Sequence, residues 1–291
     1  MRALRTTDRN QSSASLKSGI LNEGRRGVVR SEISGVRALR RVERSQSSAS
    51  IRLNRAIAAC GLCSRRAADK LIADRQVQVN GKTVTDFNLL VNLKKDRLQV
   101  GEKRISASTH EYIILHKPGS IISTCQDEFK RKNVLDLLPA NLRHLKPAGR
   151  LDYDSSGLML LTNDGTLINK LTHPTGEIEK IYQVTVAGKV KPEAIAELAS
   201  GVDLKHSKTK RARVRILKTN QKESLIEIAI KEGKNRQIRR MCAQLGLPVI
   251  ALVRTGVSKL QLTNLPEGKW RHLTKSELTD LKKELKIDPR L

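Results

Sequence analysis

The apolar positions of residues 51–105 repeat first with helical spacing and then with strand alternation. Leu53 and Ile57 share one face of a short helix, and Ser64 is a suitable N-cap for a second helix. Alternating valines then lead into Asn80-Gly81, a pair that is typical of a two-residue hairpin turn. The pattern therefore predicts a small domain of two helices and several short strands.

From residue 111 onward, apolar runs of strand length are interleaved with helical patterns, which indicates a larger α/β region. Asp164 is placed to cap one helix, Pro192 opens another, a third follows residue 235, and Thr274 with Glu277 forms a capping box before the last. Strands are expected at 112–115, from 121–122 onward, and at 158–161, 181–186, 211–216, 225–230, 249–253 and 257–262.

The net charge of the chain indicates its binding partner, not its fold. The 291 residues carry 56 Lys and Arg against 29 Asp and Glu, a formal net charge of +27. A surplus of this size favours a polyanionic partner, and nucleic acid is expected before an anionic membrane. No apolar run approaches the length of a membrane span, and no apolar signal core opens the chain, so we expect no membrane partner and no secretion. We also expect no small-molecule substrate.

Four cysteines in a chain of this length do not make a disulfide framework, and they indicate a reducing compartment. Cys60 and Cys63 form a CxxC pair, but no second ligand pair has suitable spacing. We therefore expect Cys60 to pack as a small hydrophobe, with no metal bound.

Residues 1–50 contain no aromatic residue, and Arg and Lys outnumber Asp and Glu eleven to four. This composition predicts a basic, disordered extension that attracts RNA phosphates without specificity. The segment also repeats itself, since Arg2 to Arg5 recurs as Arg37 to Arg40. A small duplication or an upstream start codon would explain the repeat. An organelle transit peptide is the second interpretation, so we expect a cytoplasmic protein with an organelle as the alternative.

The most informative stretch runs from Ala148 to Thr162. A polar turn that contains Arg150, Asp152 and Asp154 leads directly into the apolar run 158–161, which has the length and flanks of a buried strand. These side chains are therefore expected on a loop at the edge of a sheet, where chemistry is often placed. A surface turn with solvated carboxylates is the plainer interpretation.

The motifs in and around this stretch resemble those of RsuA-like ribosomal RNA pseudouridine synthases. GRLD followed by SxGL and TNDG resembles their catalytic loop, and HKPG at 116–119, EKxYxV at 179–184 and EGxNRQIRRM at 232–241 resemble their other motifs. The resemblance covers residues 52–280. It implies an α+β catalytic domain over residues 111–285, built on a mixed, mainly antiparallel sheet flanked by helices. It also implies that Asp152 is the nucleophile, and that Tyr182 stacks on the target uracil and helps to move a proton.

Helical periodicity distinguishes the arginines of the EGxNRQIRRM motif. At roughly 100° per residue, Arg236 and Arg240 point away from the apolar face, while Arg239 lies at its boundary. The family's partner of the catalytic Asp aligns with Arg239. We therefore expect Arg239 to pair with Asp152 and Arg236 and Arg240 to contact RNA, with Arg236 as the alternative partner because a first helical turn can deviate from ideal geometry.

Residues 51–105 resemble the S4-type RNA-binding domain of ribosomal proteins, whose two short helices present basic side chains to RNA. Together, the two resemblances imply an RNA-binding set formed by Arg52, Arg55, Arg65, Arg66, Lys70, Arg150, Lys180, Arg236 and Arg240. Arg150 and Asp154 would also brace the catalytic loop.

The resemblance implies a site-specific ribosomal RNA pseudouridine synthase that needs neither cofactor nor metal and acts as a monomer. The charged loop 126–132 and the string NRQIRRM favour a large-subunit RNA target. A small-subunit target, a non-catalytic ribosome-assembly protein and, more weakly, a DNA-binding protein remain alternatives. Asp152 would attack the sugar or assist the loss of a neighbouring proton.

Overall fold

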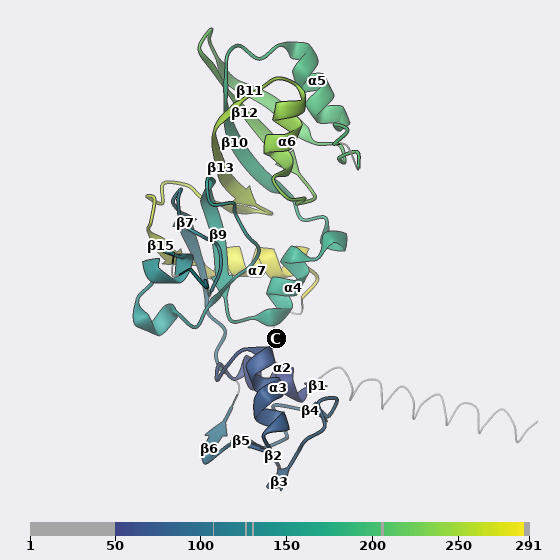
Figure 1. Cartoon of the computed structure of the whole chain (residues 1–291), viewed down its shortest axis with the longest axis vertical. Helices are drawn as coiled ribbons and strands as arrows, with labels where there is room; N and C mark the ends of the chain where they lie inside the picture. The colour runs from purple at the N-terminus through teal and green to yellow at the C-terminus, as the bar shows by residue number, and fades with distance from the viewer. Residues whose placement is uncertain (1–49, 107, 126, 130, 205–206, 288–291) are drawn as a thin grey trace, which may run out of the picture.

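A computed structural model describes residues 50–106, 108–125, 127–129, 131–204 and 207–287. The expectations for residues 1–49 lie outside this part of the chain. The described chain forms a small N-terminal domain and a larger domain that follows it (Figure 1).

The N-terminal domain packs helices α2 (Leu53–Ala59) and α3 (Arg65–Ala73) together above short strands. The Ser64 hydroxyl accepts a hydrogen bond from the Ala67 amide, which confirms the predicted N-cap. Cys60 packs against the core of this domain, as expected. The strands form a sheet in the order β3-β2-β5-β6 and a separate pair β1-β4; their bounds are β1 Ile51–Arg52, β2 Val77–Val79, β3 Lys82–Thr83, β4 Leu90–Val91, β5 Leu98–Val100 and β6 Lys103–Ile105.

The hairpin between β2 and β3 also forms where the sequence predicts it. Asn80 and Gly81 are its two loop residues and have φ values of 52° and 80°. A type I′ turn requires positive φ at both positions, which asparagine and glycine tolerate best.

The larger domain is built on a nine-stranded sheet whose main path is β11-β12-β10-β13-β9-β7-β15, with β14 paired to β13 and β8 paired to β9. All pairings are antiparallel except that of β13 with β9, so the expected mixed, mainly antiparallel sheet is confirmed. The strands are β7 Tyr112–Lys117, β8 Lys146–Pro147, β9 Ser156–Thr162, β10 Lys180–Ala187, β11 Arg213–Thr219, β12 Glu223–Ile230, β13 Val249–Val257, β14 Leu260–Gln261 and β15 Trp270–His272.

The helices of the larger domain cover two halves of this sheet (Figure 1). Helices α5 (Pro192–Ser200) and α6 (Gln237–Gln244) bury apolar side chains in a core with β10, β12 and β13. Helices α4 (Gly165–Thr172) and α7 (Lys275–Glu284) share a second core with β7, β9 and β13, and the 3₁₀ turns η1 (Val134–Leu137) and η2 (Ala140–Leu142) contribute to a third. A further 3₁₀ turn, η3 (Pro174–Gly176), follows α4.

The predicted helix caps agree with the structure. Asp164 accepts hydrogen bonds from the amides of Thr166 and Leu167 at the start of α4. Thr274 and Glu277 form the reciprocal capping box of α7. Within the described residues, no helix combines the length and the apolar character that crossing a bilayer requires.

Three strand predictions were wrong in detail. Residues 121–122 do not begin a strand, because Ile122 makes only an isolated bridge to Asn133. Strand β7 continues through Lys117 instead of ending before it. Residues 249–257 form one continuous strand, in which Gly256 pairs with Ile181 and Gln261 on either side and Thr255 is the extra residue of a bulge. The expected strand 257–262 is instead the end of β13, a turn at 258–259 and the short β14.

The parallel contact between β9 and β13 places the predicted catalytic loop. Val253 lies opposite Ser156 and Arg254 opposite Gly157, so the loop that ends at Ser155 enters the sheet next to β13. Strand β10, which carries Tyr182, lies on the other side of β13. Residues from three distant segments of the sequence therefore meet at one point of the sheet.

Candidate active site

A buried lysine fixes the backbone of the loop that carries Asp152. Lys117 is fully buried at the end of β7, and its ammonium group donates to the carbonyl oxygens of Pro118 (2.9 Å), Asp152 (3.2 Å) and Ser155 (2.7 Å). Burial lowers the pKa of Lys117 to about 8, while the nearby carboxylates of Asp152 and Asp154 oppose this shift. Because Lys117 uses all three of its donors on backbone oxygens, it fixes the path of the loop.

Hydrogen bonds from Ser123 and Ser120 also fix the backbone of this loop. The Ser123 hydroxyl donates to the carbonyl oxygen of Leu151 (2.6 Å) and accepts from the Leu151 amide (3.1 Å). The Ser120 amide donates to the carbonyl oxygen of Tyr153 (2.8 Å). The residue before Asp152 and the residue after it are thus both fixed through their backbone atoms. Asp152 is left with a side chain that is 34% exposed.

Arg236, just before α6, and Arg239, in the first turn of α6, both bind Asp154. Arg236 donates to the two carboxylate oxygens of Asp154 at 3.1 and 2.9 Å. The Nε of Arg239 lies 3.3 Å from the same carboxylate, and its Nη2 donates to the Asp154 carbonyl oxygen at 2.7 Å. Hydrogen bonding by Arg236, with a further contribution from Arg239, lowers the pKa of Asp154 below its usual value.

The expected ion pair between Arg239 and Asp152 is therefore absent, and that expectation is corrected. Among the described residues, Arg236 is the cation at ion-pair distance from the Asp152 carboxylate, with its Nη1 at 4.0 Å. The expectation that Arg236 points away toward RNA is corrected at the same time. Arg239 does lie at the boundary of burial, with 14% of its side chain exposed, but it turns to Asp154.

Backbone conformation explains why Arg236 takes this place. Helix α6 begins only at Gln237, and Arg236 precedes it in the left-handed region, with φ of 47° and ψ of 34°. An ideal helical projection does not apply to a residue in this conformation, so its side chain can turn back over the catalytic loop. The fallback assignment of Arg236 beside Asp152 agrees with the structure.

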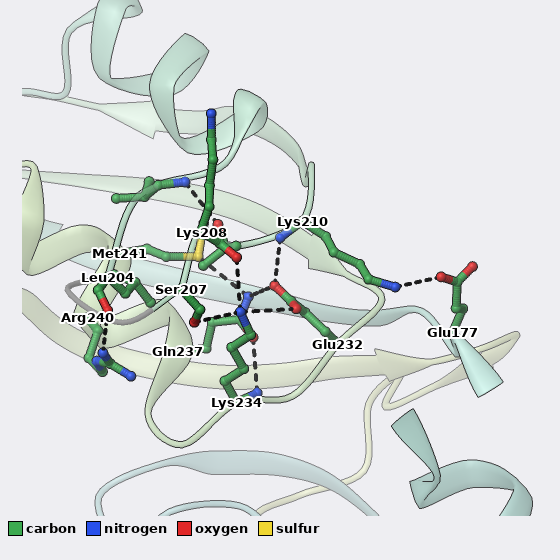
Figure 2. Close-up of polar contacts among 12 residues, drawn as sticks. Glu177, Leu204, Ser207, Lys208, Lys210, Glu232, Lys234, Gln237, Arg240 and Met241 are labelled. Atoms are coloured by element: carbon green, nitrogen blue, oxygen red, sulfur yellow. Dashed lines mark hydrogen bonds and ion pairs between the residues drawn. The ribbon is translucent and has the colours of Figure 1, made fainter. Parts of the chain in front are cut away.

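A polar network holds the segment before α6 that carries Arg236 (Figure 2). The buried Gln237 side chain donates to Glu232 (2.6 Å) and accepts from the Lys234 amide (3.1 Å), and Glu232 also accepts from the Lys210 amide (2.9 Å). The Lys234 ammonium donates to the Ser207 hydroxyl at 3.0 Å. These contacts connect the segment before α6 to the loop between α5 and β11.

Asp152 and Tyr182 line one cavity of 240 Å³. Asp152 and Arg236 line its polar side, while Tyr182, Ile230 and Leu252 provide apolar surface. Tyr182 packs against two of the cores of the larger domain, so its ring is held in one place. A cavity with a carboxylate, a cation and a fixed aromatic ring can hold a planar base and present its sugar to a nucleophile.

The basic residues predicted from the S4-type resemblance lie exposed on or beside α2 and α3. Arg55 also donates to the Thr166 hydroxyl of α4 (2.9 Å), so this side chain links the two domains. The exposed set consists of Arg52, Arg55, Arg65, Arg66 and Lys70. Their role in RNA binding stays a prediction.

The remaining predicted RNA contacts are divided among several places. Arg150 is exposed and lines the cavity of Asp152, and Lys180 is half-buried on β10. Arg240 is exposed and donates to the Leu204 carbonyl oxygen at 3.2 Å. Arg236 is engaged by Asp154, as described above.

Sequence reasoning missed the buried position of Lys117 and the central place of Asp154. The only local signal for the first is a lysine at the end of an apolar strand, where an ammonium group can be buried only if carbonyl oxygens satisfy it. For Asp154, the weak signal is that a second acidic residue follows Asp152 by two positions. Nothing in either pattern shows which groups the two side chains contact.

Comparisons with known proteins agree with this geometry. The family model of RNA pseudouridylate synthase matches residues 111–244, and that of the S4 domain matches residues 51–98. Ribosomal large subunit pseudouridine synthase B of Bacillus subtilis is 40% identical over 233 residues, which are 79% of this chain and 95% of that protein. The dual-specificity RNA pseudouridine synthase RluF of Escherichia coli is 39% identical over 233 residues, which are 79% of this chain and 78% of that protein.

Among solved structures, a crystal structure of a pseudouridylate synthase aligns with a TM-score of 0.58 at 31% identity and covers 80% of this chain and all of that one. The two family models therefore match both domains, and the match of the larger domain includes Asp152, Tyr182 and Arg236. The chain belongs to the RNA pseudouridylate synthase family and carries an N-terminal S4 domain.

Proposed function

We propose that the protein converts one uridine of large-subunit ribosomal RNA to pseudouridine, with Asp152 as the nucleophile. The observation that carries the proposal is that Asp152, Tyr182 and Arg236 line one cavity, on a loop whose backbone is clamped on both sides of Asp152. The names of the B. subtilis and E. coli relatives support RNA as the substrate, and the first supports the large subunit.

The reaction is an isomerisation that needs no oxidant, reductant or water in its overall balance. The bond between uracil N1 and the sugar C1′ breaks, the uracil turns, and a bond forms between C5 and C1′. The proton leaves C5 and N1 gains one. The enzyme must hold a base that has left its stack, and it must keep a carboxylate ionised near the sugar.

Each residue has a role in this scheme. Asp152 attacks the sugar or assists the loss of a neighbouring proton, while Arg236 at 4.0 Å favours its charged form. Tyr182 stacks on the uracil and helps to move a proton. Asp154 positions Arg236 and Arg239 and does not touch the substrate.

Mapping pseudouridines in ribosomal RNA of a strain that lacks the gene tests the proposal. We expect one site in large-subunit RNA to lose its modification and to regain it with the unaltered gene, but not with Asp152→Asn. Loss of a site in small-subunit RNA would contradict the choice of target. Restoration by Asp152→Asn would contradict the role of Asp152 as the nucleophile.

A further inference from the structure

A second cavity of 380 Å³ lies directly beside the cavity that contains Asp152. The two cavities share Arg150, Tyr182, Gly233 and Lys234 among their lining residues. This size is within the range of about 300–1,000 Å³ that ligand pockets occupy. A neighbouring nucleotide of a polynucleotide whose uridine enters the first cavity is therefore within reach of the second.

A β-bulge builds the wall of this second cavity. Lys180 lies opposite Val257 and Tyr182 lies opposite Arg254, while the register between β10 and β13 shifts at Ile181 and Tyr182. Positions 254 and 257 would lie on opposite faces of a regular strand. The extra residue of the bulge brings both to the face that carries Lys180 and Tyr182, and all four line the cavity.

Two of these side chains are cations without an anionic partner. Arg254 is 5% exposed, and its Nε donates to the Leu158 carbonyl oxygen at 2.8 Å. Lys180 is half-buried, and burial together with the charge of Arg254 lowers its pKa. Within the described part of the chain, no carboxylate lies within ion-pair distance of either side chain.

Two other lysines that line the cavity, Lys210 and Lys234, each have a carboxylate partner (Figure 2). Lys210 pairs with Glu177 at 2.6 Å, and Lys234 lies 3.8 Å from Glu232. Like charges that are buried together without an anion are unfavourable, and a bound anion removes that cost. Arg150 and Lys231 also line the cavity without a carboxylate at ion-pair distance, but both are exposed. Lys180 and Arg254 are therefore the two unpaired cations of the cavity that are withdrawn from solvent.

We propose that this second cavity binds the phosphodiester and sugar of the RNA nucleotide next to the target uridine, with Lys180 and Arg254 as its phosphate-binding residues. Leu171 and Val257 supply the apolar surface against which the sugar and the edge of the base lie. The inference rests on the proposed function and adds to it a defined subsite. It also explains why a bulge interrupts the strand pair beside Tyr182.

Chemical neutralisation of single phosphates tests the subsite. The RNA is a stem-loop that contains the uridine identified by the mapping experiment, with one methylphosphonate linkage placed at each position around it. Binding is measured with the Asp152→Asn protein, which keeps the uridine unreacted, and with the same protein carrying Lys180→Gln. Lys218→Gln is the matched control, because Lys218 is an exposed lysine on β11 that lines neither cavity.

We expect neutralisation of one linkage adjacent to the target to raise the Kd of the Asp152→Asn protein roughly tenfold. Lys180→Gln raises the Kd for unmodified RNA by a similar factor and lowers the slope of log Kd against log salt by about one. With Lys180→Gln, the same methylphosphonate then changes the Kd less than about threefold, because the contact is already lost. Lys218→Gln changes neither the Kd nor this sensitivity.

Additive effects of Lys180→Gln and of every neutralised linkage would overturn the subsite, as would an equal loss of affinity with Lys218→Gln. Pseudouridine formation by the unaltered protein is measured on the same stem-loop. If no pseudouridine forms, the proposed function fails. If pseudouridine forms and the binding effects are additive, only the assignment of the second cavity fails.

Discussion

Gly157 connects the catalytic loop to the strand beside Tyr182, and its replacement by alanine should damage both stability and activity. Gly157 has φ of +115°, and an added Cβ would lie 2.8 Å from the carbonyl carbon of Arg254 and closer still to its N and O atoms. A side chain there meets strain in its own backbone and a clash with the backbone of β13. Neither can be relieved by rotating a flexible side chain.

The size of the effect follows from these two terms. The unusual backbone conformation costs about 1–3 kcal/mol for a residue with a Cβ. Ordinary contact begins at 3.4 Å, so β9 and β13 must separate by roughly 1 Å at this point. We expect a total loss of about 3–5 kcal/mol in the free energy of unfolding. Since the loop moves with β9, we also expect the single-turnover rate to fall by roughly 100-fold.

Urea unfolding and single-turnover conversion of the stem-loop RNA measure the two effects. Gly165→Ala is the matched control, because its Cβ would meet nothing within 4 Å at the first position of α4. That change should leave the rate unaltered and alter the stability by less than about 1 kcal/mol. If Gly157→Ala unfolds at the urea concentration of the unaltered protein and reacts at the same rate, the close β9–β13 contact does not place the loop.

Substitutions at three further residues test other parts of the account. Lys117→Met leaves carbonyl oxygens under the catalytic loop without their donor, so the free energy of unfolding should fall by about 2–4 kcal/mol; urea unfolding with no loss would contradict this role. Tyr182→Leu should raise the Kd for the stem-loop roughly tenfold, because it removes a stacking surface. Tyr182→Phe should keep the Kd within about twofold of that of the unaltered protein but react more slowly. Equal Kd values for the Leu and Phe variants would refute stacking. Hydrogen bonding by Arg271 lowers the pKa of Glu277 to about 2, so Glu277 stabilises the fold above about pH 4.3 and this contribution is lost as the pH falls toward 2; the difference in urea midpoint between the unaltered protein and Glu277→Gln should therefore shrink on acidification, and a constant difference would refute the pairing.

The sequence predicted the local features of the fold well, because each depends on neighbours along the chain. A cap such as Ser64, a turn such as Asn80-Gly81 and the apolar run before Asn163 are all recognised within a few residues. The apolar residues around Thr255 are equally local, but they led to the wrong division of β13. The apolar pattern is interrupted at 254–256, and only the pairing with β10 and β14 shows that the strand continues through a bulge there.

The sequence predicts which residues form the candidate site, but not which groups their side chains contact. The motifs identify Asp152, Tyr182 and the arginine-rich turn, whereas the partner of each charge depends on long-range pairing and on backbone dihedral angles. Arg236 lies at ion-pair distance from Asp152 because it takes a left-handed conformation that no helical projection includes. Lys117 reaches the loop because β7 and β9 are neighbours in the sheet, although the residues it contacts lie 35 and 38 positions away.

A comparison of two carboxylates tests the central claim most directly. Asp152 and Asp154 lie on the same loop, and the account assigns the chemistry to the first and the positioning of two arginines to the second. The measurement is the single-turnover rate of pseudouridine formation by Asp152→Asn and Asp154→Asn, each with saturating stem-loop RNA. The account predicts that Asp152→Asn slows the reaction by at least about 10⁴-fold and that Asp154→Asn slows it by roughly 10- to 100-fold. An Asp152→Asn protein that reacts within tenfold of the unaltered rate, or the reverse order of the two variants, would contradict it.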